Sequence, residues 1–261
     1  MINKYFIKSP ISIGLGTLTL ISAMTFAQTG YEVAKSVDER LEPKDMKTDM
    51  TMVLTNSKGQ SRTSTLRTVN VNGGEKQMLW FLSPADDKGV SFLKIEHDDK
   101  DDEMRLWLPA FKKVRRISSS KKAEAFMGSD LSYEDMTNRN LDENDYELVK
   151  SEEIFEGHTC YVLKTVPKSV AESEYSSHIT WVVIDGLYPI KEESYDRTGN
   201  LLKTKDFTFI KLDGYYTPIE IYVDNVQKNH NTRLTFTNIQ LDTEIEDDLF
   251  QEKNLKRLPR D

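Results

Sequence analysis

From Met46 onward, apolar and polar residues alternate with a period of two over most of the chain. Strands have this period because successive side chains point to opposite faces of a sheet. Turn-forming residues separate the alternating stretches at 56–59, 72–74, 156–157, 186–187, 197–200 and 213–214. The pattern predicts about a dozen antiparallel strands at hairpin spacing, in a sheet that curls into a barrel or half-barrel to protect its edges.

Three segments depart from this alternation. Residues 28–41 carry Tyr31, Ala34, Val37 and Leu41 at helical spacing, which predicts an amphipathic helix of about three turns. Residues 118–138 are rich in serine and then in small apolar residues, and they predict a loop with one or two short helices lying across the sheet. Residues 244–255 predict a short closing helix. No internal repeat or linker interrupts the chain, so we expect one domain over residues 28–261.

The N-terminus has the pattern of a secretory signal peptide. Lys4 and Lys8 precede a mostly apolar run from Ile11 to Met24, and small residues lead up to Ala27. The apolar run is too short to span a bilayer comfortably. We therefore expect cleavage after Ala27, removal of residues 1–27, and a soluble product in the periplasm.

Charge and cysteine content narrow the functional classes. The formal net charge is −8, and the signal peptide carries two of the positive charges, so the exported chain is acidic. An acidic protein is not expected to bind nucleic acid, which requires a basic surface. The single Cys160 excludes an intramolecular disulfide, so burial alone must stabilise the fold. The interpretation at this stage is an exported protein, expected to be monomeric.

No arrangement of residues indicates catalysis or metal binding. The four histidines lie on or beside different predicted strands, at positions His97, His158, His178 and His230. His158 and Cys160 share a strand face, but a lone pair of ligands is more often ordinary packing than a zinc site. The sequence has no nucleophile elbow, phosphate-binding loop or dinucleotide fingerprint. We therefore predict no catalytic residue, no metal, no cofactor and no enzymatic activity.

Apolar faces are in surplus on several predicted strands. A curled sheet has a concave face that must be filled by a helix, by its own side chains or by a guest molecule. Methionine adapts to apolar ligands of variable shape. The alternative is that these residues are simply core. The hypothesis of a lipid-binding cavity predicts that it is lined by Met50, Met52, Leu106, Leu108, Phe207, Phe209, Ile219, Ile221, Val223, Leu234 and Phe236.

The stretch "RLWLPAFKKVRRI", residues 105–117, predicts a hairpin that turns at Pro109-Ala110. That turn places Glu103 opposite Arg116 and Trp107 opposite Lys112. The acidic run from Asp98 to Glu103 offsets the basic cluster only in part. We expect a basic rim at the cavity mouth that contacts lipid headgroups or a membrane partner, formed by Lys112, Lys113, Arg115 and Arg116. The alternative is an ion-pair ladder that only supports the hairpin.

Residues 104–136, "MRLWLPAFKKVRRISSSKKAEAFMGSDLSYEDM", are similar to the central signature of the outer-membrane lipoprotein-sorting protein family, a LolA-like family of exported bacterial proteins. A second matching hairpin has Gly157, Tyr161, Leu163 and Pro167. The resemblance implies a half-open antiparallel β-barrel with a helical lid and an apolar cavity. It also implies a periplasmic carrier of lipid or lipoprotein acyl chains towards the outer membrane, with transient membrane contact.

Two other functions stay open at this stage. One is a non-enzymatic accessory subunit that docks an inner-membrane transporter of the resistance-nodulation type or a release complex. Its interface would be the hairpin from Lys112 to Arg116 or the 118–138 segment. The other is a lipid hydrolase, which no motif in the sequence favours. Extractable lipid would favour the carrier, and a cavity filled by side chains would favour the accessory subunit.

Overall fold

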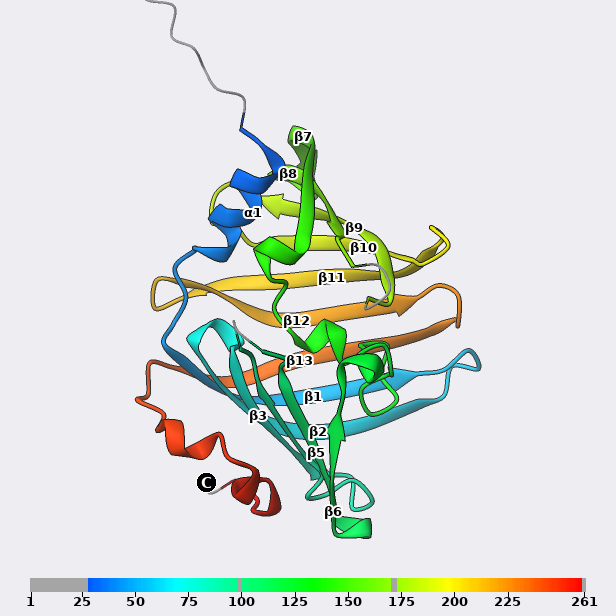
Figure 1. Ribbon diagram of the computed structural model, residues 1–261, viewed down its shortest axis with the longest axis vertical. Helices are drawn as coiled ribbons and strands as arrows, with labels where there is room; N and C mark the ends of the chain where they lie inside the picture. Colours follow the sequence, from blue (N-terminus) through cyan, green and yellow to red (C-terminus); the bar gives the residue numbers. More distant parts are fainter. Residues whose placement is uncertain (1–27, 98–99, 170–172, 260–261) are drawn as a thin grey trace, which may run out of the picture.

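A computed structural model describes residues 28–97, 100–169 and 173–259, and it consists mainly of one antiparallel sheet of 13 strands (Figure 1). The strands follow the order β6-β5-β4-β3-β2-β1-β13-β12-β11-β10-β9-β8-β7, so β6 and β7 form its two edges. The strands are β1 (Asp45–Thr55), β2 (Ser61–Val71), β3 (Lys76–Ser83), β4 (Ser91–Ile95), β5 (Glu103–Leu108), β6 (Lys113–Ile117), β7 (Asn144–Phe155), β8 (His158–Pro167), β9 (Tyr175–Val183), β10 (Pro189–Asp196), β11 (Leu201–Leu212), β12 (Tyr215–Asn225) and β13 (His230–Leu241).

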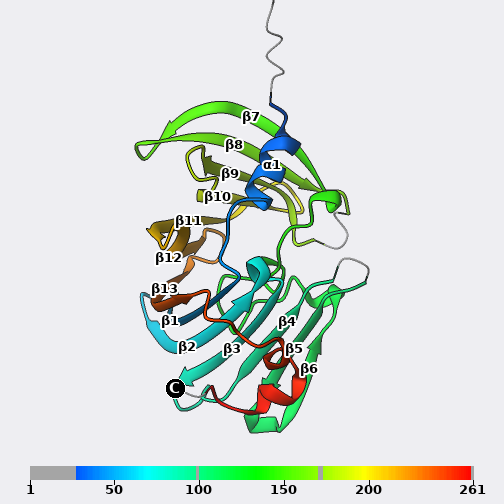
Figure 2. The same cartoon turned by 90° about the vertical axis from the view of Figure 1, so that its left-hand side faces the viewer.

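The sheet curls without closing, and its two ends face each other across a gap crossed by the chain between β6 and β7 (Figure 2). The predicted half-open antiparallel architecture is confirmed. Nearly every sheet neighbour is also a neighbour along the chain, because short turns connect hairpins. The exception is β1 beside β13, which joins the two halves. Within the described ranges, no helix is both long and apolar enough to cross a membrane.

The helix α1 (Gly30–Asp38) lies inside the curl against β7 and β8. Thr29 caps it and forms a capping box with Glu32. A Cβ atom on Gly30 would lie 2.7 Å from the backbone nitrogen of Leu148, so only glycine allows this close approach. The predicted helix is confirmed but shorter than expected. The helix ends at Asp38, so Leu41, which was predicted to belong to its apolar stripe, lies beyond the helix and is 74% exposed.

Residues 118–143, which we call the crossing segment, run from β6 to β7 over the concave face. They contain single 3-10 turns at Ser119–Lys121, Glu134–Met136 and Leu141–Glu143, where sequence analysis predicted one or two short helices. Phe126, Leu131 and Tyr133 enter the main apolar core, which is formed by concave-facing residues of β1 to β6, β12 and β13. The lid that the family resemblance implies is therefore largely non-helical here.

The C-terminal residues cover the convex face of the sheet. Two 3-10 turns, Asp247–Leu249 and Glu252–Lys256, replace the predicted closing helix. Phe250 and Leu255 are buried in a second apolar cluster that includes Met78 and Trp80 of β3. The main-chain carbonyl of Leu255 accepts a hydrogen bond of 2.6 Å from the Ser91 hydroxyl. The predicted signal peptide, residues 1–27, lies outside the described residues.

Candidate functional site: an open cleft and a buried ion network

A cleft of about 1920 Å³ occupies the concave side, between the sheet, α1 and the crossing segment. Its apolar floor comes from inward-facing positions of neighbouring strands. Met50 of β1 pairs with Phe236 of β13, and Met52 pairs with Leu234. Phe207 of β11 pairs with Ile221 of β12. These residues meet because both members of each pair occupy inward positions of the period-two pattern.

Most, but not all, of the predicted cavity residues lie in or beside this cleft. Met50, Met52, Phe207, Ile221, Leu234 and Phe236 line it. Leu106, Leu108 and Val223 belong to the apolar core next to it. Phe209 instead packs on Tyr188, with ring centroids 4.9 Å apart, and Ile219 does not line the cleft. The physical reason is a β-bulge between Thr208 and Phe209, where the pairing with β12 shifts by one residue.

The crossing segment fills part of the concave face with its own aromatic rings. The ring of Phe126 lies edge-on to Phe92 at 5.4 Å and to Tyr133 at 5.8 Å. These edge-to-face contacts are typical of a packed core. The cleft is therefore the part of the concave side that this aromatic group leaves open.

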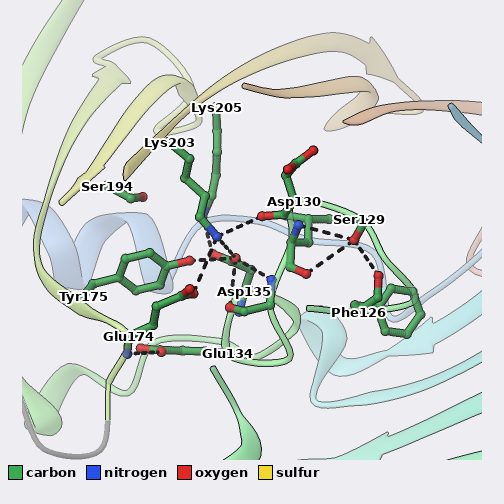
Figure 3. Close-up of polar contacts among 12 residues, drawn as sticks. Phe126, Ser129, Asp130, Glu134, Asp135, Glu174, Tyr175, Ser194, Lys203 and Lys205 are labelled. Carbon is green, nitrogen blue, oxygen red and sulfur yellow. Dashed lines mark hydrogen bonds and ion pairs between the residues drawn. The ribbon is translucent and has the colours of Figure 1, made fainter. Parts of the chain in front are cut away.

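A network of buried charges ties the crossing segment to β10 and β11. Figure 3 shows its centre, where Asp135 lies beside Lys203, Lys205 and Tyr175. Asp135 accepts hydrogen bonds from the ammonium group of Lys203 at 3.0 Å, from that of Lys205, and from the Tyr175 hydroxyl at 2.8 Å. Its carboxylate also accepts from the main-chain N–H of Ser132 at 2.8 Å. The hydrogen-bond acceptor capacity of the Asp135 carboxylate is thus satisfied by groups of the protein itself.

The network continues from Lys205 to Glu192 of β10, with the ammonium nitrogen 3.0 Å from the carboxylate. Arg139 of the crossing segment donates two hydrogen bonds of 2.6 and 2.8 Å to the same carboxylate. Such bidentate pairs are geometrically specific and stronger than single contacts. The Arg139 guanidinium also lies 3.2 Å from Nδ1 of His178. The crossing segment is therefore held at both Asp135 and Arg139.

A third anchor joins the crossing segment to β13. The main-chain N–H of Asp130 donates to the Thr232 hydroxyl, and that hydroxyl donates back to the Asp130 carboxylate at 2.7 Å. Nδ1 of His230 lies 2.7 Å from the same carboxylate. The Asp130 carbonyl accepts a 2.8 Å hydrogen bond from Lys203. The "MGSDLSYED" part of the family signature thus contains residues that attach this segment to the sheet.

The charges fix the protonation state of each group. Burial alone would raise the pKa of Asp135, but the ammonium groups of Lys205 and Lys203 outweigh it and hold that pKa well below its usual range. Burial would likewise raise the pKa of Glu192, but Arg139 and Lys205 keep it far below normal. Burial, followed by the nearby Arg139, lowers the pKa of His178 well below 6.5, so this imidazole is neutral. The network is suited to holding structure rather than to transferring protons near neutral pH.

This network was not predicted from the sequence. Lys203, Lys205 and Glu192 occupy inward positions of β11 and β10, where an apolar residue is normally expected. Two lysines at alternate positions beside an apolar pair, Phe207 and Phe209, were the available signal. A charged inward position without a partner in the local sequence indicates a partner from a distant segment.

The predicted hairpin at 105–117 is present, but its turn and register differ. The turn covers Pro109–Phe111 and Lys112, and it places Trp107 opposite Val114 and Arg105 opposite Arg116. The expected two-residue turn at Pro109-Ala110 was wrong because the loop has four residues. This difference moves each pairing by two residues and keeps Leu106 and Leu108 on the inward face.

The basic residues of the hairpin lie outside the lining of the cleft. Lys112, Lys113, Arg115 and Arg116 are absent from the described residues that line it. Arg115 pairs with Glu124 of the crossing segment. The acidic run neutralises other cations, since Asp102 pairs with Lys122 at 2.9 Å and Glu103 with Arg105 at 2.9 Å. The tip of the hairpin lies at the end of the molecule opposite α1 and β7 (Figure 1).

No group of three or more histidine, cysteine or carboxylate side chains in the described ranges is arranged to hold a metal ion. Cys160 is fully buried, and its thiol lies 3.7 Å from the main-chain carbonyl of His158. Cys160 therefore packs within the sheet, whereas His158 on the same strand is exposed.

Comparison with other proteins gives the family. A family model described as "Uncharacterized protein" matches residues 73–257. A domain from Vibrio parahaemolyticus, named for outer membrane lipoprotein sorting, is 32% identical with a TM-score of 0.82, and the match covers 87% of this chain and 98% of that chain. A DUF1329 family protein from Desulfovibrio piger is 31% identical with a TM-score of 0.81, and coverage is 87% and 97%.

A LolA superfamily protein from Nitrosomonas europaea shares the fold at 18% identity, with a TM-score of 0.69 and coverage of 87% of this chain and 99% of that chain. The comparison with curated proteins gave no match. The identity and coverage of the first two structures exceed what a shared fold alone produces. The chain therefore belongs to the DUF1329 family, and it shares the LolA-like fold of the three similar structures.

Proposed function

We propose that this protein is an exported periplasmic carrier that binds acyl chains of lipids or lipoproteins in the cleft and passes them towards the outer membrane without enzymatic activity. The observation that supports this most directly is the apolar floor. Phe207, Ile221 and Phe236 remain only partly buried although they point to the inside of the curl. Partly buried aromatic and branched side chains in a concavity are typical of a site for an apolar guest.

The dimensions and energetics fit an acyl chain. The cleft volume of about 1920 Å³ is larger than that of ordinary small-molecule pockets, which measure about 300–1,000 Å³. Each methylene group that leaves water stabilises the complex by about 0.8 kcal/mol. A chain that lies along the floor from Met52 to Phe207 would offset much of the cost of leaving a bilayer. The name of the similar Vibrio parahaemolyticus domain points in the same direction.

The test is native mass spectrometry of protein purified from the periplasm, followed by titration with a fluorescent fatty acid. We expect bound lipid in the purified protein. The double variant Phe207→Gln with Phe236→Gln should weaken binding because it makes the floor polar. Phe111→Gln is the matched control, since Phe111 is 69% exposed on the hairpin turn, outside the cleft. Equal binding by the double variant and the control would contradict an acyl-chain site in this cleft.

A second function is favoured by one observation, the filling of part of the concave face by Phe126, Leu131 and Tyr133. A filled interior suits an accessory subunit that docks an inner-membrane transporter and carries nothing. Protein that contains no extractable lipid, does not bind the fatty acid and remains with an inner-membrane transporter after mild solubilisation would support this alternative.

A further inference from the structure

Two polar side chains lie beside the apolar floor and lack partners. Thr68 of β2 and Gln77 of β3 both line the cleft. Thr68 is only 4% exposed, and its hydroxyl forms no hydrogen bond with any described residue. The side-chain carbonyl of Gln77 is likewise buried and without a partner in the described part of the chain. Buried polar atoms nearly always have a partner, so two such atoms in one cleft require an explanation.

The two side chains are placed to bind one polar group together. Thr68 pairs with Leu79, and Asn70 pairs with Gln77, so Thr68 and Gln77 are diagonal neighbours on the inward face. Diagonal neighbours across a strand pair are about 7–8 Å apart. A headgroup with two hydrogen-bonding atoms can reach both side chains. Leu79 and Met50 lie next to them, where the apolar floor begins.

The charges around this position do not favour an anion. Lys94 of β4 is paired with Gln77 in the sheet and is 3% exposed. Its ammonium group is already neutralised by Glu96 at 2.6 Å, and Glu96 also accepts from the main-chain N–H of Asn138 at 2.8 Å. Thr68 and Gln77 therefore contribute one hydroxyl and one carbonyl acceptor that form no hydrogen bond within the described part of the chain, whereas Nε2 of the nearby His97 lies 3.4 Å from the Glu103 carboxylate. The hydroxyl and the carbonyl require at least one hydrogen-bond donor from the ligand and offer no uncompensated cation.

We infer that Thr68 and Gln77 form a subsite for an uncharged headgroup that carries hydroxyl or amide donors, with the attached acyl chain on the floor that begins at Met50 and Leu79. The Gln77 carbonyl accepts from the headgroup, and the Thr68 hydroxyl donates to it or accepts from it. The inference rests on the proposed acyl-chain site and adds the headgroup class.

The experiment compares three ligands with the same acyl chain in a displacement titration: a monoacylglycerol, the methyl ester of the fatty acid, and a lysophosphatidic acid. We expect the wild-type protein to bind the monoacylglycerol most tightly. Thr68→Val keeps the shape of the side chain, and Gln77→Leu removes the acceptor. Each should weaken monoacylglycerol binding by about 3–10-fold, as expected for one lost hydrogen bond, and leave methyl ester binding unchanged.

Thr63→Val is the matched control, because Thr63 is an exposed residue of the same strand. Equal binding of the monoacylglycerol by Thr68→Val, Gln77→Leu and the control would overturn the subsite. Tighter wild-type binding of the lysophosphatidic acid would also overturn it, since the headgroup would then be anionic. If the wild-type protein binds none of the three ligands, the acyl-chain carrier itself is refuted, and the inference is refuted with it.

Discussion

Replacing Asp135 by asparagine tests whether the buried ion network holds the crossing segment in place. The network contains three carboxylates, Glu174, Asp135 and Glu192, and three cations, Lys203, Lys205 and Arg139, so its formal charges cancel. Asp135→Asn removes one negative charge and leaves a net charge of +1 in a buried site. The Lys203 and Lys205 ammonium groups then face each other across an amide.

The expected cost follows from burial. Breaking a buried ion pair by removal of one partner destabilises a protein by about 3–5 kcal/mol, because the remaining charge is left without compensation. Lys205→Met should cost less, since Asp135 retains Lys203 and Glu192 retains its bidentate contact with Arg139. The double variant restores a formally neutral network. It should therefore lose less free energy of unfolding than the sum of the two single variants, with a coupling of about 1–3 kcal/mol.

The assay is urea unfolding of the four proteins of this cycle, followed by tryptophan fluorescence, with the midpoint and slope fitted separately. The chain has 3 tryptophans, and Trp80 and Trp107 lie on the half of the sheet that the crossing segment covers. A coupling below about 0.5 kcal/mol would refute the reasoning, because it is the value seen for independent sites. The loss of stability at acidic pH provides a second measurement. A carboxylate with a lowered pKa contributes stability that is lost as pH falls below its unfolded value of about 3.9. Asp135→Asn should make the fall in stability at acidic pH less steep.

Three further predictions address other parts of the molecule. Burial and the nearby Arg139 lower the pKa of His178, so the unfolded state binds more protons than the folded state below about pH 6.5. The free energy of unfolding should therefore rise with pH through that value. His178→Asn should remove this rise, which unfolding titrations at about pH 5 and pH 7 would measure. Leu255→Ala should lower the free energy of unfolding by about 2–5 kcal/mol because Leu255 is 1% exposed, whereas the half-exposed Leu258→Ala should change it little. The double variant Lys112→Glu with Arg116→Glu should change the free energy of unfolding by less than about 1 kcal/mol and leave fatty-acid binding intact, since both residues are exposed and outside the cleft. Weaker fatty-acid binding by this variant would show that the hairpin takes part in the binding site.

The sheet and much of the cleft floor are predictable from the sequence because both depend on short-range patterns. The pairing of Met50 with Phe236 and of Met52 with Leu234 follows from matching inward positions on two strands. Local irregularities were not predictable in the same way. The bulge at Thr208 and Phe209 and the longer turn before Lys113 change the register without an obvious compositional signal.

The ion network could not be predicted because its members are far apart along the chain. Asp135 and Lys205 are separated by 70 residues, and Arg139 and Glu192 by 53. Alternation identifies which residues share a strand face, but it does not place a non-repetitive segment over that face. The sequence therefore offers no partner for Lys203 and Lys205. The family signature marked the residues of the crossing segment, and only the fold shows what they contact.

The position of this network also explains why part of the concave face stays open. If the inward positions of β10 and β11 were apolar where Glu192, Lys203 and Lys205 stand, hydrophobic burial would draw the crossing segment and these strands into one closed core. Charged groups at these positions instead fix the segment at defined distances through directional contacts. The apolar floor, including Phe207, then lies between this polar region and the aromatic core around Phe126. An ion network that contributes little net stability can therefore preserve a partly exposed apolar surface, which is the feature a carrier requires.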